Sequence, residues 1–169
     1  PRVQEAMEKE FSQLALYPDG SSYALREALS AFYGLAGEQF IFGNGTDEIV
    51  QYVSRAFLAP GTNTVMATPT FPRYQTNAII DGAEVIEVPL QEGEHDLQQM
   101  KKEVNDQTRV VWVCNPNNPT GNAIDHHTLQ EFIRDLPQDV LIVLDEAYYE
   151  YVTADDYPDS FALLKEHAN

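Results

Sequence analysis

The chain has 169 residues, of which 43% are hydrophobic, and carries a formal net charge of −17 at pH 7. This length and composition suit one globular domain with a single core. The acidity argues against sequence-independent nucleic-acid binding and against an anionic membrane as partner, because both depend on basic side chains. No apolar run approaches the roughly 20 residues of a membrane-spanning helix. The chain starts without a signal-peptide pattern and has one cysteine, Cys114, so we expect a reducing, cytoplasmic location.

The first 35 residues predict two helices separated by a turn. Apolar side chains recur at helical spacing between Val3 and Leu14, which favours a first helix with one apolar face. The string Tyr-Pro-Asp-Gly-Ser-Ser at 17–22 is rich in turn formers and ends that pattern. A second helix is expected over Tyr23–Tyr33, ended by Gly34.

From residue 39 onward, short apolar strands alternate with helical segments. The predicted strands are 39–42, 64–67, 84–88, 109–114 and 140–144. The predicted helices begin near residues 46, 74, 96 and 128. Such alternation indicates βαβ units, so the expected fold class is α/β, a three-layer αβα arrangement around a mainly parallel sheet. Open sheets of this kind bind ligands beyond the carboxyl ends of their strands.

A glycine-containing loop precedes the helix expected near residue 46. Residues 43–48 read Gly-Asn-Gly-Thr-Asp-Glu, and Thr46 is expected to be the N-cap of that helix. Free N–H groups at a helix start, together with the helix dipole, suit a phosphate. An ordinary turn before a capped helix is the alternative interpretation. A nucleoside triphosphate is disfavoured, because no lysine follows the glycines.

Two acidic residues, Asp145 and Glu146, follow the apolar strand predicted at 140–144. This pattern is similar to the magnesium-binding strand of P-loop ATPases, but the lysine-bearing phosphate loop is missing. A paired-carboxylate acid–base site is also disfavoured, because adjacent strand residues point to opposite faces. We therefore expect at most one of the two carboxylates to face the ligand crevice.

The most specific string is Asn-Pro-Asn-Asn-Pro-Thr-Gly at 115–121, directly after a predicted strand. Taken alone it would be a turn. Together with Asp-Glu-Ala-Tyr at 145–148 it resembles the class I/II aminotransferases of pyridoxal-phosphate (PLP) fold type I. With the strings at 17–18, 43–48 and 69–71, the chain is most similar to the histidinol-phosphate aminotransferases within that family. The resemblance covers essentially the whole chain.

The resemblance implies a PLP site and assigns roles around the cofactor ring. Asp145 would pair with the pyridine nitrogen and keep it protonated. Asn118 and Tyr148 would hydrogen-bond the phenolic oxygen of the ring, and these three residues are the candidate catalytic set. Phe71 would stack on the ring face.

The resemblance also assigns the phosphate end of the cofactor and a partner. Backbone groups of Gly45, Thr46 and Asp47 would hold the phosphate. Tyr17 would reach the phosphate of the cofactor bound to the partner subunit, which implies a homodimer with shared active sites. No metal is implied.

The implied reaction is transfer of an amino group between histidinol phosphate and 2-oxoglutarate, a step of histidine biosynthesis. The partners would thus be a small-molecule amino donor and a 2-oxo acid. Alternatives are a related PLP enzyme, such as an aromatic aminotransferase or a phosphothreonine decarboxylase, and a non-catalytic PLP-fold sensor domain.

The reactive lysine of the family follows a serine on a strand. None of the lysines here, Lys9, Lys101, Lys102 and Lys165, has that context. We therefore expect residues 1–169 to be an incomplete PLP-binding large domain that lacks the N-terminal arm, the lysine-bearing strand and the C-terminal small domain, and to be inactive alone.

Overall fold

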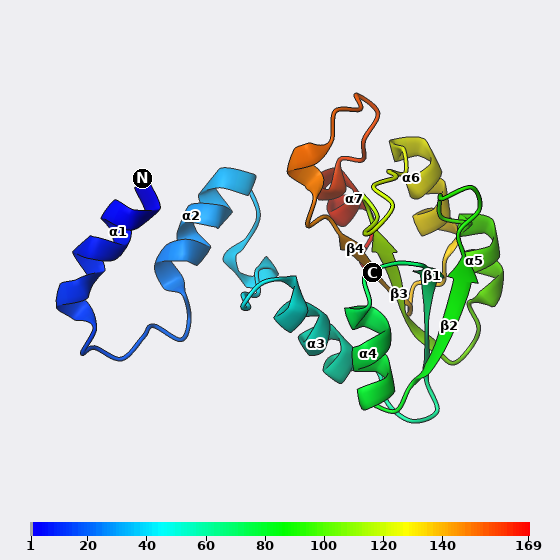
Figure 1. Cartoon of the computed structure of the whole chain (residues 1–169), viewed down its shortest axis with the longest axis horizontal. Coiled ribbons are helices and arrows are strands. Elements are labelled where there is room, and N and C mark those ends of the chain that lie inside the picture. Colours follow the sequence, from blue (N-terminus) through cyan, green and yellow to red (C-terminus); the bar gives the residue numbers. More distant parts are fainter. Residues whose placement is uncertain (1) are drawn as a thin grey trace. The chain divides into compact units, whose positions relative to one another are not determined.

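The computed structural model describes residues 2–169 and divides into two compact units, with the boundary between Phe42 and Gly43. Figure 1 labels the α-helices and strands of both units. The first unit is helical and consists of α1 (Arg2–Glu10), the 3-10 helix η1 (Phe11–Gln13), α2 (Tyr23–Tyr33) and the 3-10 helix η2 (Gly37–Gln39). Both predicted helices are thus confirmed. Gly34 ends α2 with a φ of 66°, a conformation that glycine adopts without strain.

The strand predicted at 39–42 is wrong. Gln39 ends η2, and the residues after it form no strand. Arg26 explains the difference, because its Nη1 donates to the carbonyl oxygens of Gly37 and Phe40, each at 2.5 Å. Its guanidinium also lies 4.9 Å from the centre of the Phe42 ring. A helix side chain therefore satisfies the Phe40 carbonyl, which a strand at 39–42 could offer to a neighbouring strand.

The second unit contains the predicted sheet. Its elements are α3 (Thr46–Phe57), β1 (Asn63–Thr68), α4 (Arg73–Ile80), β2 (Glu84–Pro89), α5 (Leu97–Glu103), β3 (Thr108–Cys114), α6 (His126–Asp135), β4 (Leu141–Asp145), the 3-10 helix η3 (Tyr149–Tyr151) and α7 (Ser160–Glu166). The strands lie in the order β2-β1-β3-β4, and all three pairings are parallel. The three-layer αβα prediction is confirmed.

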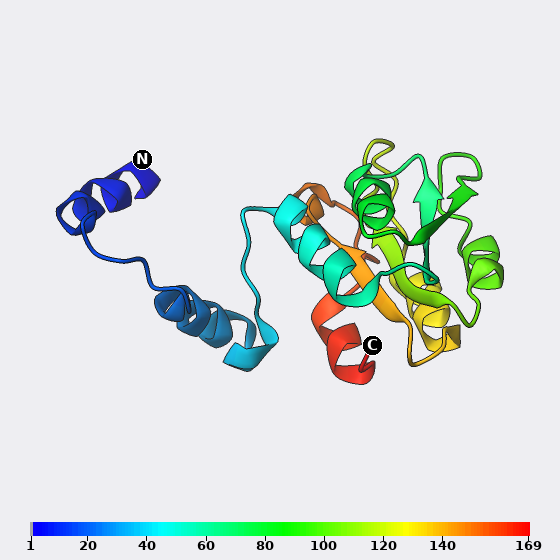
Figure 2. The ribbon, with the colours of Figure 1, turned by 90° about the horizontal axis from the view of Figure 1, so that it is seen from below.

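Alternate residues of β3 pack into two separate cores, one on each face of the sheet. Val111 and Val113 join the core that α5, α6 and α7 cover. Val110 and Trp112 join the core beneath α3 and α4. Figure 2 shows the two helix layers of this unit on either side of the strands. The continuous apolar run of β3 is explained by this two-sided burial.

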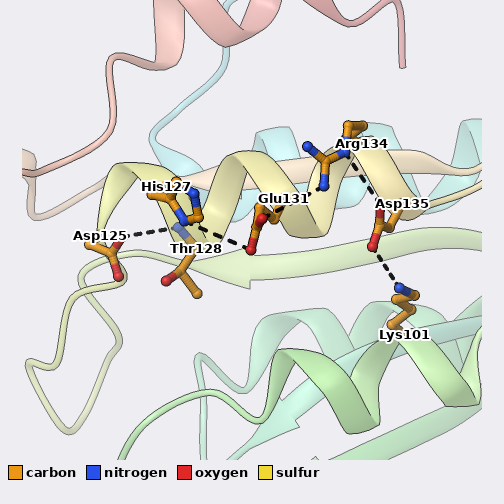
Figure 3. Close-up of polar contacts among 7 residues, drawn as sticks. All are labelled: Lys101, Asp125, His127, Thr128, Glu131, Arg134 and Asp135. Carbon is orange, nitrogen blue, oxygen red and sulfur yellow. Dashed lines mark hydrogen bonds and ion pairs between the residues drawn. The ribbon is translucent and has the colours of Figure 1, made fainter.

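Helix α6 is fixed by polar contacts at both ends (Figure 3). The Asp125 side chain caps its start by accepting from the Thr128 N–H at 3.0 Å. Asp135 at its end forms an ion pair with Lys101 of α5 at 2.7 Å. His127 lies in the exposed first turn, with its Nδ1 3.8 Å from Glu131. Within residues 2–169, every helix is too short or too polar to cross a lipid bilayer.

Candidate active site

Three loops leave the same edge of the sheet, at the carboxyl ends of β1, β3 and β4. They begin at Pro69, Asn115 and Glu146. Cys114 pairs in register with Asp145, and the Asn115 N–H donates to the Asp145 carbonyl at 2.9 Å. The loops after β3 and β4 therefore meet at one rim of the sheet.

Asp145 is the last residue of β4, and both oxygens of its carboxylate accept hydrogen bonds. The Tyr74 hydroxyl donates to Oδ2 at 2.6 Å, and the Ala147 N–H donates to Oδ1 at 3.1 Å. Glu146 instead accepts from Tyr157 at 3.1 Å, and burial raises the pKa of its carboxyl. The two acids have different partners, in keeping with the alternation of side chains along a strand.

Asn118 and Tyr148 come together across two loops, as predicted. The Asn118 amide nitrogen lies 3.4 Å from the Tyr148 hydroxyl. Tyr148 is 43% exposed, so its hydroxyl remains open to a ligand. A pocket of about 490 Å³ lies between their loops. Its lining consists of Pro116, Asn117, Asn118, Pro119, Gly121, Ala123, Tyr148, Tyr151, Val152, Thr153 and Ala154.

Asn117 joins the loop after β3 to the loop after β1. It is 2% exposed, and its amide nitrogen donates to the Pro69 carbonyl at 3.1 Å. The same nitrogen donates to the Thr120 hydroxyl at 3.0 Å. Its amide oxygen accepts from the Thr70 hydroxyl at 2.8 Å. Asn117 thereby fixes the relative placement of the Asn118 and Phe71 loops.

Phe71 belongs to a run of aromatic rings beside Asp145. Its ring meets that of Tyr74 edge to face, with centroids 5.5 Å apart. The Tyr74 ring in turn stacks on Trp112 at 4.7 Å. Phe71 is half-buried, whereas Tyr74 is fully buried. Packing against Tyr74 therefore orients a ring that keeps part of its surface accessible.

The loop before α3 has the glycine-dependent geometry expected of an anion site. Gly45, with φ 74° and ψ −177°, occupies a region that is essentially restricted to glycine. Gly45 is the N-cap, so the prediction that Thr46 caps the helix is wrong, and Thr46 is instead its first residue. The N–H groups of Thr46 and Asp47 have no acceptor within the helix, because they lie in its first turn. They remain able to bind an anion.

Charged side chains surround this helix start. Glu48 Oε2 accepts from the Asn44 backbone N–H at 2.6 Å, and this contact lowers the pKa of Glu48. Asp47 forms an ion pair with Arg73 of α4 at 3.0 Å. Arg73 offsets the negative charge of Asp47 beside the free N–H groups. A pocket of about 230 Å³ lies here, lined by Asn44, Asp47, Glu48, Gln51, Arg73 and Asn77.

Comparison with known proteins assigns the whole chain to a family. The family model described as "Aminotransferase class I and II" matches residues 1–169. The chain belongs to this family. As a class I and II aminotransferase chain, it is 57% identical over its whole length to a histidinol-phosphate aminotransferase of Anoxybacillus flavithermus, and spans 46% of that relative. It is 58% identical over 99% of its length to the protein of the same name from Geobacillus thermodenitrificans, again spanning 46% of it.

A solved structure has the same fold. The histidinol-phosphate aminotransferase of Sinorhizobium meliloti, in complex with pyridoxal-5'-phosphate, matches with a TM-score of 0.87 and 26% identity. The match covers 94% of this chain and 43% of that one. The aminotransferase chain described here thus spans about half the length of the curated relatives it matches.

Four polar contacts of this aminotransferase site are absent from the sequence prediction. They involve Tyr74, Asn117, Arg73 and Glu48. Sequence offered one usable signal, because Glu48 lies in the first helical turn, where an acid is favoured near the N–H groups. The other three reach across segments distant in sequence. Tyr17 lies in the other unit and is fully exposed, and its contact with a partner subunit stays a prediction.

Proposed function

We propose that this chain is the cofactor-binding part of a longer PLP-dependent aminotransferase, which moves an amino group between histidinol phosphate and 2-oxoglutarate. The observation that carries the proposal is the identity of 57% and 58% along the chain to proteins named for that activity. The fold likeness to a protein whose structure contains PLP supports the cofactor. The N-terminal arm, the lysine-bearing strand and the small domain would lie in the rest of that longer protein.

The donor set around Asp145 fits a pyridine ring. When bound, PLP supplies an electron sink for the negative charge left on the substrate carbon after a proton leaves. Asp145 would hold the ring nitrogen protonated, because a carboxylate stabilises a neighbouring cation. Its two hydrogen bonds, from Tyr74 and Ala147, keep the carboxylate in one orientation.

Asn118, Tyr148 and Phe71 would position the rest of the ring. The Asn118 amide and the Tyr148 hydroxyl lie 3.4 Å apart and can both donate to a single acceptor such as the phenolic oxygen. Phe71 would stack on the ring with a gain of about 0.5–1.5 kcal/mol. Its half-buried ring is supported from behind by Tyr74.

The start of α3 would bind the phosphate. The backbone N–H groups of Thr46 and Asp47 are the donors, and the helix dipole adds to the attraction. Gly45 contributes mainly its conformation, because its own N–H donates to the Gly43 carbonyl at 2.9 Å. The ion pair of Asp47 with Arg73 reduces the repulsion that a free carboxylate would exert on a phosphate.

The enzyme would work in the cytoplasm as a homodimer with shared active sites. Tyr17 supports the shared active sites, since its fully exposed phenol is available to a second subunit. The four lysines of the chain lie on α1, α5 and α7 and are Lys9, Lys101, Lys102 and Lys165. None of these helical positions matches the strand position of the reactive lysine of the family, so the chain alone should show no turnover.

The test uses the complete enzyme that contains this chain. Its rate of amino transfer to 2-oxoglutarate is measured with histidinol phosphate, tyrosine and phenylalanine as donors, and decarboxylation is measured with phosphothreonine. We expect the highest kcat/KM with histidinol phosphate. A higher kcat/KM with an aromatic donor, or decarboxylation of phosphothreonine, would refute the substrate assignment. The variant Asp145→Ala is the control for the cofactor, and an unchanged rate would refute the PLP site.

A further inference from the structure

Tyr74 is a buried phenol to which the roles above assign no contact with substrate or cofactor. It lies in the first turn of α4 and has no exposed surface. Its ring is held between two aromatic neighbours, with Trp112 stacked at 4.7 Å and 9° and Phe71 edge to face at 5.5 Å and 78°. Because the ring is held between these neighbours, its hydroxyl is directed to the end of β4, at Asp145.

That hydroxyl donates a hydrogen bond to the Asp145 carboxylate. The distance of 2.6 Å to Oδ2 is in the range of charge-assisted O–H···O⁻ bonds. Burial raises the pKa of Tyr74 far above its usual value, and the nearby Cys114 and Asp145 raise it further. The phenol therefore keeps its proton around neutral pH and donates it to the carboxylate.

Resting on the proposed function, we infer that Tyr74 is a positioning residue for Asp145. Its hydroxyl fixes the carboxylate in one rotamer and stabilises its charged form, which the pairing with the cofactor ring nitrogen requires. A hydrogen bond to the charged form of an acid favours that form. Through Tyr74, the buried side of α4 supports the residue that would hold the cofactor ring.

Removing the hydroxyl has a consequence that loss of packing does not have. Without this donor, the negative charge of the Asp145 carboxylate loses a stabilising hydrogen bond. The acid side of the pH–activity profile should then move to higher pH. Phenylalanine keeps the ring between Trp112 and Phe71, so the fold and the stacking surface should persist.

The experiment compares Tyr74→Phe with Tyr157→Phe in the complete enzyme. Tyr157 is the comparison variant, because it is a second phenol at this strand end whose hydroxyl lies 2.5 Å from the Asn115 carbonyl oxygen and 3.1 Å from Glu146, and not against Asp145. We expect Tyr74→Phe to lower kcat about tenfold to a hundredfold with little change in the KM of the amino donor, since hydrogen bonds to charged groups are the stronger ones. Its acid limb should move up in pH, and that of Tyr157→Phe should not. An unmoved limb in Tyr74→Phe would overturn the inference.

A double-mutant cycle separates this inference from the proposed function. PLP affinity is measured by fluorescence for Tyr74→Phe, Asp145→Asn and the double variant. If Tyr74 acts through Asp145, the double variant should bind PLP about as weakly as Asp145→Asn alone, whereas additive losses would overturn the inference. Unchanged affinity in Asp145→Asn would instead sink the proposed PLP site itself.

A second replacement keeps the test decisive if Tyr74→Phe does not fold. Incorporation of 3-fluorotyrosine at position 74 preserves the ring and makes the phenol a stronger donor. The acid limb should then move to lower pH, opposite to the direction expected for Tyr74→Phe. A limb that stays in place with 3-fluorotyrosine contradicts the assigned role.

Discussion

Asn117 offers a quantitative test of how the site is held together. Its side chain makes three hydrogen bonds, to the Pro69 carbonyl, the Thr70 hydroxyl and the Thr120 hydroxyl, at distances of 3.1, 2.8 and 3.0 Å. The substitution Asn117→Ala removes all three from a position that is 2% exposed. Two of them join loops that belong to different strands, so the loss should loosen the rim as well as destabilise the fold.

The expected cost follows from the number of bonds. Each buried neutral hydrogen bond contributes about 0.5–1.5 kcal/mol net, so Asn117→Ala should lower the free energy of unfolding by about 3 kcal/mol. Thr70→Val removes one of the three bonds and should cost about 1 kcal/mol. The double variant should cost less than the sum, because both changes delete the same Thr70–Asn117 contact.

The assay is urea unfolding followed by the fluorescence of Trp112, the one tryptophan of the chain. Asn77→Ala is the matched control, because within residues 2–169 the Asn77 side chain donates to the Arg73 carbonyl of the same helix, at 2.9 Å. It should change the free energy of unfolding by less than about 0.5 kcal/mol. A loss below about 1 kcal/mol for Asn117→Ala, or strict additivity with Thr70→Val, refutes the reasoning.

Two further predictions concern Gly45 and Glu146. Gly45→Ala should lower the free energy of unfolding by about 1–3 kcal/mol, since φ 74° with ψ −177° strains any residue that has a side chain. It should also weaken PLP retention in the complete enzyme, and a PLP affinity equal to that of the unchanged enzyme would contradict this. Burial raises the pKa of Glu146, so the folded protein keeps a proton that the unfolded chain releases. The free energy of unfolding therefore falls as pH rises above the ordinary carboxyl range. Glu146→Gln should flatten that fall in urea unfolding followed across pH, and parallel curves would count against the buried acid.

The sheet was predictable because its strands carry their own signal. The ends of β1, β2, β3 and β4 agree with the predicted strands to within one residue. Two-sided burial selects continuous apolar runs such as 110–114, and such a run is recognisable in the sequence without knowledge of its partner strands. The false strand at 39–42 has the same kind of residues, but Arg26 donates to its Phe40 carbonyl and to the Gly37 carbonyl just before it. Local composition does not reveal such a competitor.

The site was predictable where it lies in contiguous strings. The placement of Asn118, Asp145 and Tyr148 at one rim follows from the parallel order of β3 and β4. The contact of Tyr74 with Asp145 does not, because 71 residues separate the two in sequence. Helical spacing predicts only that Tyr74 faces inward. Its reach to the end of β4 depends on how α4 crosses the sheet, which is set by packing on Trp112.

The register of β3 against β4 decides which acid meets the ring-binding side of the molecule. Cys114 is paired with Asp145, and consecutive side chains on β4 face opposite layers. A slip of β4 by one residue would exchange Asp145 for Glu146 at the rim and turn Asp145 toward the Tyr157 side. A single-residue deletion inside β4 would therefore place the wrong carboxylate at the rim, although residues 145–148 themselves would be unchanged in the sequence.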